Sequence, residues 1–397
     1  KIGQMAGSRS DLLPGPVIQE LSRLQDQVAP ISFPYIQRIV EWNYGKRLNE
    51  LFLEFRPVPL AVASIGQVHY AVLKNGEPVA VKILKPGIAR VVQTDLEIFQ
   101  KVVNQLNQRT EWGPCYPLQA MLDEFAKSIR QELDYRFEAG HMERIRRNLR
   151  KNSHIVIPKL YPQLSNERIL VTQYLEGKKI NDWLALNPSD QERNEVAESL
   201  SKAFLQQILG NGYFHSDPHP GNFLILGDNR IGLLDFGIVA QLEREKRGRL
   251  ASLLNSMAQG QVAKTVKTLS KMGIMPPGIK QQVLESDISK LRENYLGENG
   301  RRNSLGEITR QFFGIIYKHR IYIPSDFIMV GKSLIFLEDI TNNLVPGFSI
   351  INLTRPYMRR MFLEQLQPQN IQTRILKIKS LVSGGMVKNC RFENGLH

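Results

Sequence analysis

The stretch "GYFHSDPHPGNFLILGDNRIGLLDFG", residues 212–237, carries three side chains at spacings that suit phosphoryl transfer. Asn222 follows Asp217 by five residues, which is the spacing in the H-R-D-x-x-x-x-N loop of protein kinases. Asp235 begins a D-F-G sequence, and the apolar residues between Asn222 and Asp235 predict a β-hairpin that brings these two side chains together. We therefore predict that Asp217 is a catalytic base and that Asn222 and Asp235 bind Mg²⁺.

A second element lies upstream, where "VAVK" at residues 79–82 matches the strand motif V-A-I-K. This match places Lys82 where it can bind the α- and β-phosphates of ATP, as a catalytic and nucleotide-binding residue. A D-F-G sequence occurs by chance and a single strand Lys usually faces solvent. These motifs, however, occur in the order found in kinases, and each lies on the predicted strand, loop or hairpin that a kinase would use for it. We therefore predict ATP and Mg²⁺ as cofactors.

Hydrophobic periodicity predicts a β-rich lobe followed by a helical lobe, and together with the kinase-like motifs above it predicts an α+β, bilobal, protein-kinase-like fold. Residues 1–50 have helical spacing, whereas β-rich runs surround Asn75-Gly76, a strong hairpin signal. Helical patterns return at 88–149, two more strands are expected within 154–177, and 178–340 is mostly helical. The predicted segments are an N-terminal helical extension (1–50), a small antiparallel β-sheet lobe with helical insertions (51–176), a larger helical lobe (177–345) and a basic amphipathic tail (346–397), with a hinge near 173–177.

Composition narrows the class of protein. Of the 397 residues, 42% are hydrophobic, which is typical of a globular protein. The net charge of +14 suggests an anionic partner. The two cysteines are far apart in the sequence, which suggests a reducing compartment. No apolar run is long enough to cross a bilayer, and even the stretch "FIMVGKSLIFLEDI" is interrupted by Lys332. No zinc-finger or RNA-binding signature occurs, so nucleic acid is not expected as a partner.

The two ends of the chain bear on where in the cell the protein is expected. The tail has eight Lys/Arg against two Glu, and its basic amphipathic helices fit either an anionic membrane surface or packing on the large lobe. We expect a location in the cytoplasm or an organelle interior, peripheral to a membrane. The chain begins with Lys1 and not Met, so a preceding segment with any targeting signal is expected.

Four sequence marks resemble the UbiB/ADCK family of atypical kinase-like proteins: "KIGQ" at 1–4, "AVASIGQVH" at 61–69, "QELDYRFEA" at 131–139 and "FHSDPHPGNF" at 214–223. The resemblance covers almost the whole chain. It implies an ATP- and Mg²⁺-dependent kinase or ATPase that supports prenylquinone synthesis, of the ubiquinone or plastoquinone type, at a membrane. Prenylquinone-type lipids or their biosynthetic enzymes are the implied partners.

The resemblance also assigns site residues. A nucleotide-binding loop, Ala-rich where protein kinases have glycines, is expected from Ala61, Val62, Ala63, Ser64 and Gly66. Glu138 is expected to pair with Lys82, with Glu132 as the second choice. The E-x-D pair, Glu132 and Asp134, is expected to meet Lys1 and Gln4 in a segment that guards the cleft.

Alternatives remain open on the sequence alone. Aminoglycoside and choline phosphotransferases share the H-x-D-x-H-P-G-N type of loop, and a nucleotide-gated lipid-binding scaffold with little turnover would keep the same residues. Ser216 replaces the usual Arg and no A-P-E follows Gly237, so phosphorylation of proteins in trans is not expected. His219 is expected to order its loop and not to bind metal. The phosphate acceptor, the quinone and the oligomeric state are left open.

Overall fold

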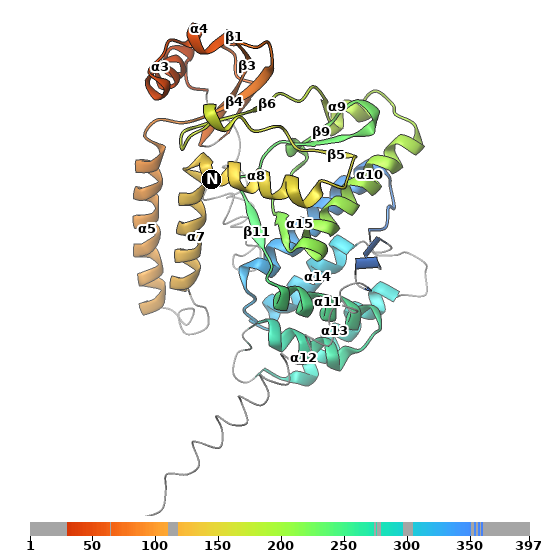
Figure 1. The fold of residues 1–397 in the computed structure, drawn as a ribbon. Helices are drawn as coiled ribbons and strands as arrows, with labels where there is room; N and C mark the ends of the chain where they lie inside the picture. The colour runs from red at the N-terminus through yellow and green to blue at the C-terminus, as the bar shows by residue number, and fades with distance from the viewer. Residues whose placement is uncertain are drawn as a thin grey trace, which may run out of the picture.

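The computed structural model describes residues 30–63, 65–109, 118–273, 275, 279–296, 305–350, 353–354, 356–357 and 359. They form two lobes, a small β-rich lobe and a larger helical lobe, in the order expected from the sequence (Figure 1). Lys1, Gln4, Ser64 and nearly all of the basic tail lie outside the described residues. Within the described part of the chain, no helix is both long and apolar enough to cross a membrane.

The small lobe is built on a five-stranded antiparallel sheet. Its strands are β1 (Phe52–Phe55), β2 (Ala61–Val62), β3 (Gly66–Leu73), β4 (Pro78–Leu84) and β6 (Ile169–Gln173). They run in the order β1-β3-β4-β6, with β2 also paired to β3. The Asn75-Gly76 turn joins β3 to β4, and Gly76 adopts the left-handed φ of +85° that favours glycine. Alternate residues of β4, including Val81 and Ile83, are buried against α3 (Phe33–Tyr44).

Helices separate the fourth and fifth strands of this sheet. After α4 (Leu48–Leu51) and the first four strands, α5 (Ile88–Arg109) and α7 (Leu118–Glu132) lie side by side at one edge of the molecule (Figure 1). Helix α8 (Tyr135–Leu149) then lies across the junction of the two lobes (Figure 1). Asp134 caps it by accepting a hydrogen bond from the Arg136 amide.

Strand β5 (Ile155–Val156) corrects one expectation. We predicted it within the small lobe, but it pairs in parallel with β10 (Ile231–Leu233) in the sheet of the large lobe. The reason is the path of α8, because Met142 and Leu149 belong to the large-lobe core and carry the chain down to that lobe. Only β6 of the two predicted strands returns to the small sheet.

The large lobe holds two short sheets and a helical body. The sheets have the orders β5-β10-β9-β7 and β11-β8, formed by β7 (Lys178–Lys179), β8 (Tyr213–His215), β9 (Phe223–Ile225) and β11 (Val239–Gln241) with β5 and β10. The helices are α9 (Ile180–Leu184), α10 (Asp190–Leu205), α11 (Arg244–Ala258), α12 (Val262–Met272), α13 (Gln281–Leu296), α14 (Leu305–Lys318) and α15 (Ser325–Leu344).

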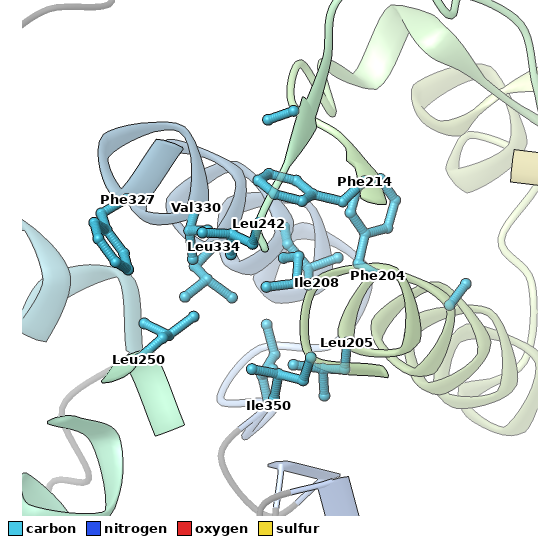
Figure 2. Packing of buried hydrophobic residues seen from close by; sticks show 14 of the residues in the cluster. Phe204, Leu205, Ile208, Phe214, Leu242, Leu250, Phe327, Val330, Leu334 and Ile350 are labelled. Carbon is cyan, nitrogen blue, oxygen red and sulfur yellow. The ribbon is translucent and has the colours of Figure 1, made fainter. Parts of the chain in front are cut away.

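One continuous core joins these helices to the strands that carry the candidate site. Phe214 of β8 and Phe204 of α10 pack close to Leu334 and Val330 of α15 (Figure 2). A π-helical turn, Gln206–Asn211, follows α10 and ends at Gly212, where φ is +65° and a Cβ would lie 2.4 Å from the Leu242 carbonyl oxygen. The chain can therefore enter β8 at this point only with glycine.

Candidate phosphoryl-transfer site

Lys82 lies between two carboxylates. Its Nζ is 2.8 Å from both carboxylate oxygens of Glu138 and 3.5 Å from Oδ2 of Asp235. The Lys82 and Glu138 side chains are only 17% and 6% exposed, whereas Asp235 is 45% exposed. Burial opposes the charge on Lys82, but Asp235 and Glu138 outweigh it and hold the pKa of Lys82 above its usual value. The ammonium group is therefore charged, and Glu138 is the partner that the structure provides.

Helix α8 also holds the D-F-G segment. The Phe236 amide donates to Glu138 Oε1 at 3.4 Å, and Nδ1 of His141 donates to the Phe236 carbonyl at 3.1 Å. The Phe236 side chain is completely buried, and the Gly237 amide donates to Asp235 Oδ1 at 2.8 Å. These bonds fix the backbone while the Asp235 carboxylate stays accessible, as a metal ligand must be.

A buried histidine, His215, connects residues 215–222, the candidate catalytic loop, to the D-F-G segment. Nε2 of His215 donates to the Asp235 carbonyl, and Nδ1 accepts from the Asp217 amide at 3.1 Å. This pair of bonds requires the neutral imidazole with its proton on Nε2, and burial lowers the pKa of His215 accordingly. Strand β8, which ends at His215, pairs with β11 after the D-F-G segment, and the Ser216 hydroxyl donates to the Ile238 carbonyl at 3.1 Å. The backbones of Asp217 and Asp235 are thus held together, while both carboxylates stay partly exposed.

The amide of Asn222 faces the same unit. Its Nδ2 donates to the Asp217 carbonyl at 3.0 Å, and the backbone of Asn222 accepts from Leu234 at 3.0 Å across the β9–β10 hairpin. Nδ2 is therefore occupied, and Oδ1 is the atom that could bind a cation. His219 accepts from the Gly221 amide at 3.1 Å, which is the loop-ordering role expected for it.

These donors fit Mg²⁺ and not a metal that needs a closed protein cage. Among the described residues, no group of three His, Cys, Asp or Glu side chains could hold a metal ion. Mg²⁺ in nucleotide sites is bound through one or two protein oxygens together with phosphate oxygens and water. The Asp235 carboxylate and the Asn222 amide oxygen offer oxygen atoms of this kind.

Asp217 has a partner that we did not predict. Oδ1 of Asp217 lies 3.4 Å from Nζ of Lys332 on α15, with the two side chains 35% and 26% exposed. In the sequence, Lys332 shows only as a charge that interrupts an apolar run. No local pattern could have placed it beside a residue more than one hundred positions earlier.

The Ala-rich segment forms a hairpin next to Lys82. Ala61 pairs with Val68 and Val62 with Gln67, and the Ala63 amide donates to the Gly66 carbonyl at 2.8 Å. Ser64 lies outside the described residues. A Cβ on Gly66 would lie 2.7 Å from the Ile83 carbonyl oxygen, so Gly66 permits close approach of β3 and β4.

Two further residues of the same motif hold the chain that enters the small lobe. The Gln67 side chain accepts from the Ile31 amide at 2.8 Å and donates to the Ile31 carbonyl at 3.3 Å. It also donates to Nε2 of His69 at 2.8 Å, while Nδ1 of His69 donates to the Arg56 carbonyl at 2.9 Å. Both side chains are completely buried. We did not assign them a role from sequence, although a buried Gln and His on one strand face is an unusual signal.

The E-x-D residues lie where α7 ends and α8 begins. Glu132 is buried at the end of α7, and Asp134 is occupied by its cap and by an ion pair of 2.7 Å with Arg136. The expected contact of this pair with Lys1 and Gln4 lies outside the described residues. It stays a prediction.

Comparison with known proteins agrees with this geometry. Residues 23–269 match the ABC1 atypical kinase-like domain, and residues 288–349 match the UbiB helical domain. The chain is 32% identical to the chloroplastic protein ACTIVITY OF BC1 COMPLEX KINASE 7 of Arabidopsis thaliana, over 94% of this chain and 54% of that protein. It is 27% identical to a probable protein kinase UbiB of Cellvibrio japonicus, over 94% of this chain and 68% of that protein.

Two other similarities concern length and fold. An uncharacterized protein of Synechocystis is 31% identical over 90% of this chain and 61% of its own length, so the chain spans little more than half of several relatives. A solved Mycobacterium tuberculosis protein, in complex with erythromycin, has a TM-score of 0.59 and 23% identity, and the match covers 88% of this chain and 92% of that one. Together with the domain match, this likeness confirms the predicted kinase-like fold.

Proposed function

Because the chain belongs to the ABC1/UbiB family of atypical kinase-like proteins, we propose that it binds ATP with Mg²⁺ and turns ATP over between its two lobes. One observation carries the proposal. The Lys82 ammonium group lies within 3.5 Å of Asp235, while His215 links Asp235 to Asp217 in the catalytic loop. A purely structural cluster has no need to keep the Asp235 and Asp217 carboxylates accessible.

Each residue has a role in this chemistry. Lys82 binds the α- and β-phosphates, and Asp235 and Asn222 hold the cation, which neutralises phosphate charge when bound. Asp217 orients the acceptor and takes its proton as the acceptor oxygen bonds to the γ-phosphorus. The bond from that phosphorus to the bridging oxygen breaks, and ADP leaves.

The acceptor in this proposal is water or a small molecule and not a protein. Helix α11 begins at Arg244, so only residues 238–243 separate it from Gly237. Protein kinases place a long activation segment and a peptide-docking surface in this region. The short connection argues against a docked peptide and favours an ATPase or a small-molecule kinase.

We further propose that the activity supports prenylquinone synthesis at a membrane. The support is the UbiB name of the Cellvibrio relative and the UbiB helical domain of this chain. The proposed location includes an organelle interior, because the Arabidopsis relative is chloroplastic. The basic tail would provide contact with anionic lipid, although Tyr357, at its start, packs against the large-lobe core and donates to the Lys202 carbonyl at 3.2 Å.

The experiment measures ATP binding and ATP turnover, with and without anionic liposomes and phenolic quinone precursors. Asp235→Asn should lose Mg²⁺-dependent ATP binding, and Asp217→Asn should keep binding but lower turnover about 100-fold. The matched control is Asp228→Asn, which changes an exposed carboxylate in the turn of the β9–β10 hairpin and should behave as wild type. Binding without turnover under every condition would support the nucleotide-gated lipid-binding scaffold in place of an enzyme.

A further inference from the structure

The ion pair between Lys332 and Asp217 joins the helical domain to the catalytic loop. Lys332 lies on α15, within the segment that matches the UbiB helical domain, and its Nζ is 3.4 Å from Oδ1 of Asp217. Helix α15 also packs against β11, the strand that follows the D-F-G segment. The segment that matches the UbiB helical domain thus places a lysine beside Asp217, the residue that we propose as the base.

The catalytic loop itself supplies no such cation. The sequence from Asp217 to Asn222 is D-P-H-P-G-N, with no Lys or Arg, and His219 is turned to the Gly221 amide. Lys82 is paired with Glu138 and Asp235. Charge develops on the oxygens of the γ-phosphoryl group during transfer, and a positive group beside Asp217 would stabilise it.

A structural role alone explains Lys332 poorly. Twelve residues of α15 are buried, whereas the Lys332 side chain is 26% exposed and its Nζ lies 5.5 Å from the centre of the Phe336 ring, one turn along the same helix. An ion pair with a quarter to a third of each side chain exposed contributes little to stability. Partial exposure is instead what a cation needs if a phosphate is to reach it.

The helix that carries Lys332 is firmly placed. At its first turn, the Ser325 hydroxyl donates to Glu124 of α7 and Lys246 of α11 pairs with Asp326. Farther along, Val330 and Leu334 insert into the large-lobe core (Figure 2). A functional group on such a rigid element is held in a defined position, with only the flexible lysine side chain free to adjust.

We propose that Lys332 is a phosphate-facing cation of this site, which orients Asp217 before nucleotide binds and contacts the γ-phosphoryl group during transfer. The inference rests on the proposed function. The contribution of Lys332 in this proposal is electrostatic, so an arginine should replace it in part. ADP has no γ-phosphoryl group, so its affinity should not depend on Lys332.

The test compares Lys332→Met, Lys332→Gln and Lys332→Arg with Lys318→Met, which removes a lysine from a 2.8 Å ion pair with Asp287 between α13 and α14. Lys332→Met and Lys332→Gln should lower turnover roughly 10- to 100-fold and reduce the preference for ATP over ADP several-fold, with ADP affinity unchanged. Lys332→Arg should recover part of both, and Lys318→Met should change neither. Combining Lys332→Met with Asp217→Asn should cost less than the product of the separate losses.

The outcomes separate this inference from the proposed function. Wild-type protein that binds no ATP would overturn both. A second outcome is that wild-type protein turns ATP over and that folded Lys332→Met or Lys332→Gln does so equally well, with unchanged preference for ATP over ADP. This outcome would overturn the role of Lys332 and leave the proposed function standing. Lys332→Arg no better than Lys332→Gln, with both variants folded, would also overturn it, because the effect would then not depend on charge.

Discussion

The two lysine–carboxylate pairs of this site differ in burial and in number of partners. Lys82 is 17% exposed and lies between Glu138 and Asp235, whereas Lys332 is 26% exposed and meets Asp217 across 3.4 Å. The first pair is short, at 2.8 Å, and is reinforced by the Phe236 amide. Buried pairs are rigid and expensive to break, while exposed pairs exchange partners easily. We infer that the Lys82 side is preformed and that the Asp217 side adapts to substrate.

The largest expected effect is on the preformed side. Glu138→Ala leaves the buried Lys82 with the more exposed Asp235 as its carboxylate partner, and should lower the free energy of unfolding by about 3 kcal/mol. Urea denaturation measures the change. Glu143→Ala, on the same helix but in a more exposed pair with Arg146, is the control and should cost less than about 1 kcal/mol. Equal losses for the two variants would show that the Lys82 pair is not preformed.

The sequence predicted one side of the comparison better than the other. The Lys82 and Asp235 motifs are short patterns on strands and turns, so their order along the chain was enough to predict two lobes and a site between them. Lys332 could not be found in this way, because its contact depends on how α15 packs in the core. The pairing of β5 was missed for a similar reason, since it depends on which lobe the end of α8 is buried in.

Within the Ala-rich motif, sequence indicated the location but not every role. Gly66 was expected to line the nucleotide loop, and the structure adds a packing reason for the absence of a side chain. Gln67 and His69 were read only as part of the family motif, because their hydrogen bonds to Ile31 and Arg56 join residues that are distant in sequence. The predicted family is confirmed, whereas the proposed roles of the individual site residues await experiment.

A smaller loss is expected for Gly66→Ala, which tests the packing behind the nucleotide loop. The new methyl group would lie 2.3 Å from the Tyr135 hydroxyl and 2.7 Å from the Ile83 carbonyl oxygen, so β3 or β4 must shift. Overpacking of this kind costs about 2 kcal/mol. Gly140→Ala in the middle of α8 is the control, because nothing lies within 4 Å of its Cβ position and it should gain about 0.5–1 kcal/mol from helix propensity. A Gly66→Ala protein as stable as wild type would mean that the strands have room to move.

Gln67→Ala should cost about 1–2 kcal/mol, because it leaves the Ile31 amide and carbonyl and the His69 ring without their side-chain partner. The loss should be local, so hydrogen exchange at Ile31 should accelerate while exchange in α15 stays unchanged. Gln37→Ala removes a side chain that donates to Glu41, one turn along α3, and provides a matched glutamine control. Uniform acceleration throughout both lobes would contradict a local anchoring role for Gln67.

The smallest expected effect on stability is at Asp217. Asp217→Asn keeps the size of the side chain and removes a charge that is 35% exposed, and Lys332 can turn to water once its partner is neutral. The free energy of unfolding should therefore change by less than about 1 kcal/mol, in contrast to about 3 kcal/mol for Glu138→Ala. Urea denaturation of the two variants side by side gives the comparison, and Lys332→Met should resemble Asp217→Asn. If Asp217→Asn instead destabilised the protein as much as Glu138→Ala, the Lys332–Asp217 pair would be a structural clamp. The loss of turnover in that variant would then reflect a disordered catalytic loop and not the loss of a base, so a small change in stability is required before the activity of Asp217→Asn can be interpreted chemically.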